Sequence, residues 1–443
     1  MKESLRILHI NDLHSHFEAY PKIKRFFAEH SKTQREVLRF DIGDNVDKSH
    51  PLTDVSAGRV NVDLMNDLGI DFATIGNNEG IGLAKAEINQ LYHKADFHVI
   101  LGNLRDKKGR PTWAQPYVIY ETKVGTKLAL LAYTFPYYWT YGPNGWQVLD
   151  AISSLKKDLE NPEVAAADFR ILLSHLGIRL DEKIARQVPE IDLIIGAHTH
   201  HVFEEGEVVN GTYLAAAGRY GDHVGQIDLD FEDHSLTNIA IEAVPTSDLD
   251  SEKEDAAFVA HLFEEGEKLL AENLICKLSR QPSLKECADL VMEAMKKSAV
   301  ADLAIINTGL VVEPFSQNLT KADLHKSLPH QMRLVKFQVT QTELLEICHD
   351  IFSQADLLAN QQIRGMGFRG KQFGKVVTSG FTYKNGKIVY NNKAIGRKDK
   401  MSLVLVDQYY FAPYFNSLTS RKGQLLFPDL LRQTVEKYLR GDL

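Results

Sequence analysis

The sequence predicts a two-domain α/β protein, and three observations support this prediction. The chain has 443 residues, which at about 150 residues per domain is enough for two or three domains. In the first half, short apolar runs alternate with amphipathic helical patterns, as in layered α/β domains. Near Pro245 the pattern changes, and a long polar helix precedes a second mixture of strands and helices.

The expected strands of the first half are short, continuous apolar runs bounded by turn residues. They cover residues 5–10, 37–42, 72–75, 171–173 and 191–195. Such runs are typical of strands that are buried on both faces. Helical patterns stand between them, for example over residues 60–68 and 181–188. Strands separated by helices indicate a layered α/β domain.

One amphipathic helix is expected between the two halves, over residues 251–274. Ser251 and Glu254 could form its capping box. Its apolar positions recur at helical spacing, and they are Val259, Leu262, Phe263, Gly266, Leu269 and Leu270. We therefore assign residues 1–247 to the first domain, 248–275 to a linker helix and 276–443 to a smaller C-terminal domain.

The second half mixes both element types. Helices are expected over residues 284–299 and 341–355, and strands over residues 303–307, 334–339, 387–390 and 401–406. This mixture predicts a separate α/β or α+β domain.

The composition argues against several classes of protein. Hydrophobic residues make up 44% of the chain and charged residues 25%, as in average soluble globular proteins. The net charge of -8 speaks against partners such as nucleic acid or a membrane surface, which need a basic face. No run would span a bilayer and no signal-peptide core precedes the first strand, so we expect a cytoplasmic protein. The sequence does not indicate an oligomeric state.

Five short segments concentrate side chains of the kind that bind metals. Each begins where an apolar run ends, and the carboxyl ends of strands in α/β sheets line one crevice. The segments are Asp12-Leu13-His14, Gly43-Asp44, Gly76-Asn77-Asn78-Glu79, Ser174-His175 and Gly196-Ala197-His198-Thr199-His200. We therefore expect these segments to converge on one site.

The ligand types indicate divalent transition metals. Carboxylate, imidazole and amide groups without thiolates suit Mn²⁺, Fe, Zn²⁺ and Co²⁺. In extended backbone His198 and His200 point to the same side, as do Asp12 and His14. The glycines of the second and third segments allow tight turns. A lone Asp-x-His or His-x-His pair is more often a surface or core pair, so the prediction rests on all five segments together.

The order Asp-x-His, Gly-Asp, Gly-Asn, His and Gly-x-His resembles the calcineurin-type metallophosphoesterase superfamily. The run from Ile7 to His16 resembles its 5'-nucleotidase and UDP-sugar hydrolase branch. The resemblance implies a layered β-sandwich domain flanked by helices and a C-terminal substrate-binding domain. It therefore covers nearly the whole chain.

The resemblance also implies the roles of the ligands. Asp12, His14 and His200 would hold the first of two divalent metal ions, Asn77, His175 and His198 would hold the second, and Asp44 would bridge both. A hydroxide shared by the metals would attack phosphorus in line. The implied activity is hydrolysis of phosphate esters of nucleotides or related small molecules.

The third motif departs from the family pattern. The family usually has Gly-Asn-His-Glu there, with an Asp three residues after the His, whereas this chain has Asn78 and Ile81. Asn78 can donate a hydrogen bond to a phosphoryl oxygen, but it cannot act as a general acid. We take Asn78 and Asp44 as the candidate catalytic residues. We expect anhydrides or aryl phosphates, whose leaving groups have a low pKa, to be cleaved better than nucleoside monophosphates.

The C-terminal half departs as well. Relatives often have Asn-x-Gly followed by an arginine that holds the substrate phosphate, but here apolar residues follow Gly309. A basic, glycine-rich stretch at residues 363–371 could replace that arginine, and nearby aromatic rings could hold a base. The candidate substrate-binding residues are Asn307, Arg364, Phe368, Arg369, Phe373 and Phe411. An exposed basic loop and core aromatic residues are the alternative interpretation.

Three functions stay open from the sequence. The first is hydrolysis of nucleotide phosphate esters. The second is a nucleotide-sugar pyrophosphatase or phosphodiesterase on the same scaffold. The third is a metal-dependent nucleotide-binding protein with little turnover, which the change at Asn78 permits. All seven expected ligand positions are filled, which favours an enzyme.

Overall fold

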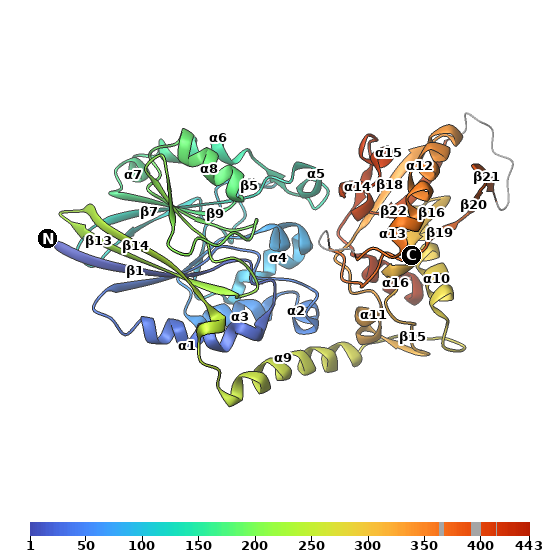
Figure 1. Cartoon of the computed structure of the whole chain (residues 1–443), viewed down its shortest axis with the longest axis horizontal. Coiled ribbons are helices and arrows are strands. Elements are labelled where there is room, and N and C mark those ends of the chain that lie inside the picture. The colour runs from blue at the N-terminus through green and yellow to red at the C-terminus, as the bar shows by residue number, and fades with distance from the viewer. Residues whose placement is uncertain (363–366, 391–399, 413) are drawn as a thin grey trace. The chain divides into compact units, whose positions relative to one another are not determined.

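The structure is a computed structural model that describes residues 1–362, 367–390, 400–412 and 414–443 (Figure 1). The chain forms two compact units, Met1–Gly266 and Glu267–Leu443. Both units combine helices with sheets. The predicted fold class, an α/β sandwich domain followed by an α/β C-terminal domain, is confirmed.

The first sheet of the N-terminal unit begins with the N-terminal strand of the chain. In order across the sheet, its strands are β14 (Ser235–Pro245), β13 (His223–Glu232), β1 (Lys2–Ile10), β2 (Glu36–Asp41), β3 (Phe72–Ala73) and β4 (His98–Val99). The strands from β1 to β4 are parallel, and β13 and β14 continue the sheet in antiparallel pairing. The carboxyl ends of β1, β2 and β3 therefore lie at one edge.

The second sheet also mixes both pairings, but its parallel centre lies between two antiparallel edge strands. Its strands are, in order, β11 (Glu207–Val209), β12 (Thr212–Ala215), β10 (Leu193–Gly196), β9 (Phe169–His175), β7 (Lys127–Thr134) and β6 (Tyr117–Glu121). Only β11 and β6 pair antiparallel with their neighbours. The strands from β12 to β7 thus end at a common edge.

The core of the N-terminal unit lies between the two sheets. Ile7 of β1 and Phe40 of β2 belong to the same buried cluster as Leu130 of β7 and Ile171 of β9. Alternate residues of the second sheet, such as Leu131, point the other way and join a second cluster with helices α6 and α8. The helices of this unit are α1 (Tyr20–His30), α2 (Pro51–Ser56), α3 (Arg59–Leu68), α4 (Lys85–Leu91), α5 (Tyr138–Tyr141), α6 (Ala151–Leu159), α7 (Pro162–Ala165) and α8 (Ile178–Gln187).

The helix expected between the two halves is α9 (Lys253–Ala271). It begins two residues later than the expected start, and Asp255 in its first turn accepts a hydrogen bond from the backbone N–H of Glu252. The ring of Phe258 stacks on Tyr20 with centroids 5.5 Å apart. At Gly266 a Cβ atom would lie 2.2 Å from the backbone nitrogen of Leu52. Glycine therefore allows α9 to approach the start of α2 closely.

The C-terminal unit is built on one five-stranded sheet. Its strands are, in order, β19 (Val376–Ser379), β16 (Leu303–Asn307), β22 (Met401–Val406), β18 (Leu334–Val339) and β23 (Gln424–Leu426). Two small strand pairs join β15 (Leu274–Lys277) to β17 (Asn318–Thr320) and β20 (Phe381–Lys384) to β21 (Lys387–Tyr390). The helices are α10 (Leu284–Ala299), α11 (Lys321–Ser327), α12 (Gln341–Ser353), α13 (Ala355–Ala359), α14 (Gln408–Phe411), α15 (Asn416–Thr419) and α16 (Leu431–Arg440). Among the described residues, no helix is both long and apolar enough to cross a membrane.

Candidate metal centre

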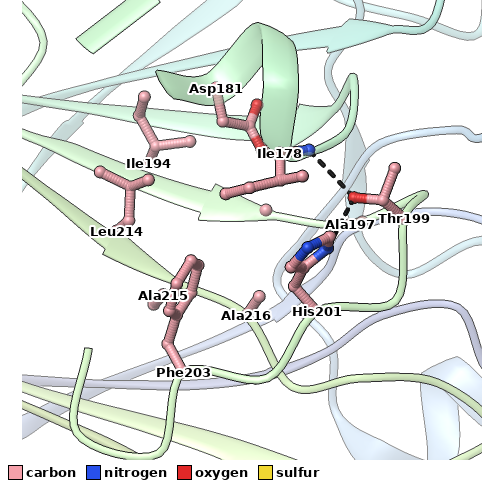
Figure 2. A pocket seen from close by; sticks show the side chains of 11 residues that line it. Ile178, Asp181, Ile194, Ala197, Thr199, His201, Phe203, Leu214, Ala215 and Ala216 are labelled. Atoms are coloured by element: carbon pink, nitrogen blue, oxygen red, sulfur yellow. Dashed lines mark hydrogen bonds between the residues drawn. The ribbon is translucent and has the colours of Figure 1, made fainter. Parts of the chain in front are cut away.

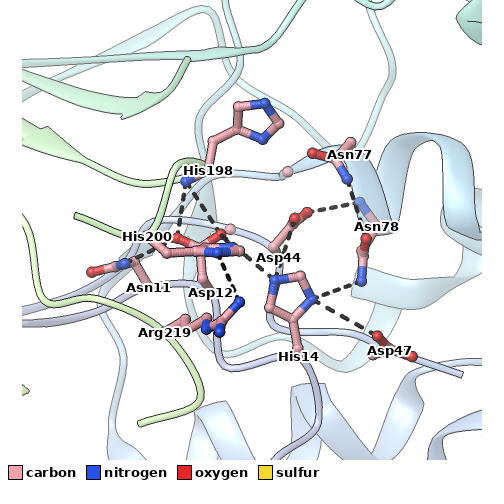
Figure 3. Close-up of polar contacts among 12 residues, drawn as sticks. Asn11, Asp12, His14, Asp44, Asp47, Asn77, Asn78, His198, His200 and Arg219 are labelled. Atoms are coloured by element: carbon pink, nitrogen blue, oxygen red, sulfur yellow. Dashed lines mark hydrogen bonds and ion pairs between the residues drawn. The ribbon is translucent and has the colours of Figure 1, made fainter. Parts of the chain in front are cut away.

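The predicted ligands follow the carboxyl ends of strands from both sheets. Asp12 and His14 come after β1, Asp44 after β2, and Asn77 after β3. His175 is the last residue of β9, and His198 and His200 follow β10. Figure 3 shows that most of these side chains gather around one point. The five segments therefore converge, as the sequence predicted.

The loops that carry the ligands have an unusual backbone. Asp12, His14, Asp44, His198 and His200 all adopt left-handed conformations, with φ between 49° and 72°. The prediction that the Asp-x-His and His-x-His pairs lie on extended backbone is therefore wrong. A left-handed residue other than glycine costs about 1–2 kcal/mol, and such residues cluster at functional sites.

Hydrogen bonds between the loops enforce this backbone. The backbone N–H of Asp12 donates to Gly43 O (3.0 Å), and that of His14 donates to Asp44 O (2.8 Å). The loops after β1 and β2 are thus tied to each other side by side. The neighbouring contacts, rather than local preference, hold the strained conformation.

Six side chains form two groups that could each hold a metal ion. The first donor group is Asp12, His14 and His200, and the second donor group is Asp44, His175 and His198. Within each group, one potential ligand atom of every residue lies within 4.8 Å of the others. These are two His/Asp sites typical of dinuclear metal centres.

Asp44 lies between the two donor groups. Its Oδ2 is 3.4 Å from His175 Nε2 and 3.7 Å from His14 Nε2, so it faces a histidine from each group. Asp12 Oδ1 similarly lies 3.6 Å from His200 Nε2 and 3.9 Å from His175 Nε2. The carboxylate of Asp44 is therefore in the place that a bridging ligand needs.

Two buried atoms have hydrogen-bonding capacity that the fold leaves unused. Asn77 Oδ1 and His175 Nε2 are buried and, within the described part of the chain, meet no hydrogen-bond partner of normal geometry. His175 Nδ1 lies 2.8 Å from Ile42 O, which fixes the ring with its Nε2 toward the carboxylates. Buried polar atoms are nearly always satisfied. The donor set therefore fits a pair of divalent cations.

The protonation states of two of the ligand histidines agree with this assignment. Burial, followed by the neighbouring histidines, lowers the pKa of His198 to about 3 and that of His200 to about 4. Both are neutral near pH 7, which is the form that binds metals. His175 differs, because although burial opposes its charge, the Asp44 carboxylate raises its pKa to about 10, so a cation that binds this ring would displace a proton. The same contact lowers the pKa of Asp44 despite its burial.

Glu79 and two glycines shape the bridging position. The buried Glu79 carboxylate accepts hydrogen bonds from the backbone N–H groups of Asp44 (3.0 Å), Val46 (2.9 Å) and Gly76 (2.8 Å). A Cβ atom on Gly76 would lie 2.0 Å from Asp44 Oδ1, and Gly43 has a φ of 85°. Glycine thus allows the left-handed turn at Gly43 and the close approach of Asp44 to the backbone at Gly76.

Asn78 contacts the first donor group. Its backbone N–H donates to Asp44 Oδ1 (2.7 Å), and its side-chain Nδ2 donates to Val46 O (2.9 Å). The same Nδ2 is 2.9 Å from His14 Nδ1. The carboxamide thus lies beside a predicted ligand (Figure 3). A catalytic role for Asn78 stays a prediction.

A threonine anchors the loop that carries the last two histidines. Thr199 Oγ1 accepts a hydrogen bond from the backbone N–H of Ile178 (2.9 Å) and lies 3.0 Å from His201 Nδ1. The three residues of these contacts line a small pocket next to β10 (Figure 2). In the same pocket, the buried Asp181 accepts a hydrogen bond from Ser174, which precedes His175. The hydrogen bonds around this pocket therefore support the segments that carry the ligand histidines.

The sequence analysis missed three contacts at the site. Tyr137 Oη is 3.2 Å from His198 Nε2, and the ring of Phe135 stacks on His198 with centroids 4.9 Å apart. Arg219 Nη1 is 3.4 Å from His200 Nδ1. Phe135 directly follows β7, and Arg219 lies shortly after β12. The rule that found the other segments needs an expected strand before each one, and neither β7 nor β12 was among the expected strands.

Three of the six candidate substrate-binding residues of the C-terminal unit lie in its core. The Asn307 side chain is fully buried, where Nδ2 donates to Phe373 O (2.6 Å) and Oδ1 accepts from Tyr409. Phe373 is also fully buried, and the nearly buried Phe368 stacks on His330.

The other three candidates differ in position. Phe411 is 38% exposed. The backbone N–H of Arg369 donates to His330 Nδ1 (3.0 Å). Arg364 lies outside the described residues. Substrate binding by all six candidates stays a prediction.

Comparison with known proteins agrees with the geometry of the site. Residues 5–202 match the model of the calcineurin-like phosphoesterase family. The chain is 37% identical to YunD, an uncharacterized metallophosphoesterase of Bacillus subtilis, over 98% of this chain and 99% of that protein. It is 25% identical to a 5'-nucleotidase of Vibrio cholerae, over 55% of this chain and 52% of that protein.

Solved structures extend the likeness to the fold of the whole chain. The NAD nucleotidase of Haemophilus influenzae aligns with a TM-score of 0.66 over 100% of this chain and 97% of that chain, at 15% identity. A 5'-nucleotidase precursor of Thermus thermophilus aligns with a TM-score of 0.60 over 99% of this chain and 96% of that chain, at 17% identity. Both units therefore have the 5'-nucleotidase fold.

Proposed function

Since this chain belongs to the calcineurin-like metallophosphoesterase family, within its 5'-nucleotidase-like two-domain branch, we propose that it hydrolyses phosphate esters of nucleotides or related small molecules. The family membership supports a metal-dependent phosphoesterase. The nucleotide substrate is the part that we propose.

The position of Asp44 carries this proposal. The Asp44 carboxylate lies within 4 Å of a histidine from each donor group, His14 at 3.7 Å and His175 at 3.4 Å. The Asp12 carboxylate also lies between the groups, but farther from the second, at 3.9 Å from His175. A charged group shared by two sites would hold a pair of cations, as in two-metal hydrolases. Isolated metal sites would not need a shared ligand.

The chain itself supplies the scaffold for this chemistry. Asp12, His14 and His200 would hold one cation, Asn77, His175 and His198 the other, and Asp44 both. When bound, such cations lower the pKa of a water and neutralise charge on phosphoryl oxygens. Ile42 O orients the ring of His175, and Glu79 holds the turns on both sides of Asp44.

The surroundings of Asn78 limit the choice of leaving group. The Asn78 amide lies between Val46 O and His14 Nδ1, and an amide cannot transfer a proton to a leaving group. Loss of a general acid typically costs ~10²–10⁴-fold. We therefore infer a preference for substrates with good leaving groups, such as anhydrides and aryl phosphates. This observation also favours the second candidate, a nucleotide-sugar pyrophosphatase.

A substrate panel tests the proposal. The full-length protein is assayed with Mn²⁺ or with EDTA on nucleoside mono- and diphosphates, a nucleotide sugar, a phosphodiester and an aryl phosphate. We expect metal-dependent release of phosphate, faster from anhydrides and the aryl phosphate than from monophosphates. Faster hydrolysis of the diester would favour a phosphodiesterase. Bound metal and nucleotide without turnover on any substrate would refute an enzymatic function and favour a nucleotide-binding protein.

A further inference from the structure

Arg219 is an exposed arginine at the edge of the metal centre (Figure 3). Its Nη1 is 3.4 Å from His200 Nδ1, and its guanidinium carbon is 4.6 Å from the centre of the Tyr220 ring. Neither partner is an anion. Within the described part of the chain, no carboxylate forms an ion pair with this guanidinium, whereas Arg6 and Arg25 of the same unit pair with aspartates at 2.7 Å. Its charge is therefore not neutralised by the fold.

The segment that carries Arg219 is fixed to the segment that carries Asp12. The backbone N–H of Tyr220 donates to Asp12 O (2.8 Å), and Asn11 Nδ2 donates to Gly218 O (2.6 Å). Gly218 and Tyr220 both have left-handed backbone, with φ of 74° and 60°. Because this turn is tied at two points, Arg219 keeps a defined position relative to the first donor group.

The Tyr220 ring restricts the guanidinium further. His16 stacks on that ring with centroids 3.8 Å apart, and His14 meets its edge at 5.6 Å. A planar guanidinium packs well over an aromatic ring. Arg219 therefore loses less freedom on binding a ligand than a fully mobile surface arginine would.

The contact with His200 also depends on what the imidazole binds. His200 Nε2 is the atom that faces Asp12, at 3.6 Å from Oδ1. A neutral imidazole that binds a cation through Nε2 carries its proton on Nδ1. Nδ1 then cannot accept a hydrogen bond from Arg219. The donors of the guanidinium would be available to another acceptor beside the first donor group.

From this geometry we propose that Arg219 binds a second anionic group of the substrate, a phosphate next to the phosphoryl group that is hydrolysed. The inference rests on the proposed function and deepens it, because it selects phosphoanhydrides within the substrate class. The guanidinium can donate two parallel N–H groups to phosphate oxygens. An aryl monophosphate has no second phosphate and cannot use this contact.

Binding of inorganic pyrophosphate and inorganic phosphate tests the subsite directly. Titration calorimetry is done on the full-length, Mn²⁺-loaded protein and on Arg219→Gln. We expect Arg219→Gln to weaken pyrophosphate binding by about 10–100-fold, the range for a lost hydrogen bond to a charged group. Phosphate binding should weaken much less. Equal weakening of both ligands, or no change in either, would overturn the proposal.

Arg186→Gln is the matched control, because it removes one charge from the same unit. Arg186 is exposed on α8, and the one carboxylate that pairs with it among the described residues is Glu182 on the same helix, at 2.9 Å. This variant should bind pyrophosphate as the unmodified protein does. Manganese content is measured for each protein. Loss of manganese from Arg219→Gln alone would assign Arg219 to support of the metal ligands and overturn the subsite.

Turnover separates this inference from the proposed function. A protein that binds pyrophosphate through Arg219 but hydrolyses no phosphate compound would refute the proposed function and support the subsite. A protein that hydrolyses an aryl phosphate, but whose preference for a nucleoside diphosphate survives the Arg219→Gln change, would refute the subsite alone.

Discussion

His175 in the N-terminal unit and His330 in the C-terminal unit are both fully buried histidines, but their ring nitrogens meet different partners. His330 Nε2 lies 3.0 Å from Leu310 O, and its Nδ1 accepts from the backbone N–H of Arg369. His175 has one backbone partner, Ile42 O, and turns its other nitrogen to Asp44. Both nitrogens of His330 therefore meet backbone groups, whereas the second nitrogen of His175 faces the carboxylates of Asp44 at 3.4 Å and Asp12 at 3.9 Å.

The asparagines of the two units show the same difference. Asn307 uses both ends of its amide within the C-terminal core, whereas Asn77 Oδ1 is buried without a partner among the described residues. A buried polar group that the fold satisfies is structural. One that the fold leaves unsatisfied needs an explanation, and for Asn77, next to two groups of potential metal ligands, a bound cation supplies it. Residue type and burial alone would not separate the two cases.

Removal of the shared charge should have the largest effect. Asp44→Asn keeps the shape of the side chain but removes the carboxylate that faces His14 and His175. We expect kcat to fall at least about 100-fold, as for loss of a key electrostatic group. Phosphate release is measured with saturating Mn²⁺, and circular dichroism controls for folding. Activity within tenfold of the unmodified protein would show that Asp44 does not bridge the metals.

A methyl group at Gly76 should have the next largest effect. Gly76→Ala would place Cβ 2.0 Å from Asp44 Oδ1, so the carboxylate must move. We expect Mn²⁺ affinity to fall by about 10–100-fold, as for changes that disturb the surroundings of a ligand. Gly82→Ala is the control in the same turn, since its Cβ would meet only Asn78 Cβ at 3.9 Å. Equal affinities of the two variants, measured by metal titration, would contradict this geometry.

The structural role of the buried amide in the C-terminal unit can be tested by a substitution at Asn307. Asn307→Ala removes both buried hydrogen bonds of the amide, so we expect the free energy of unfolding to fall by about 1–3 kcal/mol. Urea denaturation of the full chain followed by fluorescence measures this change. If KM instead rises more than tenfold while the unfolding midpoint stays the same, Asn307 binds substrate. Its burial would then not indicate a purely structural role.

In metal-free protein, the contributions of His175 and His330 to the free energy of unfolding should depend on pH in opposite directions. Asp44 raises the pKa of His175 to about 10 although burial opposes it. Its contribution to stability is complete below its unfolded pKa of about 6.5 and lost as pH rises toward 10. Burial lowers the pKa of His330 to about 4, so its contribution is lost as pH falls from about 6.5 to 4.

Calorimetry in EDTA between pH 4 and pH 10 tests this difference. The thermal midpoint should shift by about 2–4 °C for each kcal/mol. His175→Gln should reduce the alkaline loss of stability, and His330→Gln the acid loss. Identical pH profiles for the two variants would show that the contrast between these histidines has no energetic consequence.

The metal ligands could be predicted because their signal is a pattern of residue type and position. Asp12, Asp44 and His175 each stand at or just after the end of a strand, and the parallel topology brings such ends together. The expected strands and helices of the C-terminal half were also predictable, since apolar periodicity determines them.

Other parts of the site could not be predicted from the sequence. Phe373 and Asn307 carry side chains that suit either a binding pocket or a core, and only packing decides between these. The left-handed backbone of His198 and His200 arises from contacts with segments far along the chain, which local sequence does not encode. Arg219 was missed because strand β12 before it is short and follows another strand directly.

The left-handed turns bear on how this chain can diverge. At Asp12, Asp44, His198 and His200 the backbone itself disfavours branched side chains and tolerates asparagine or glycine. A lineage could therefore exchange these residues for asparagine or glycine and keep the shape of every loop while losing the metals. A few mutations could therefore give a protein that keeps the fold but has no catalytic activity. Similarity of fold alone is thus weak evidence that a distant relative is an enzyme.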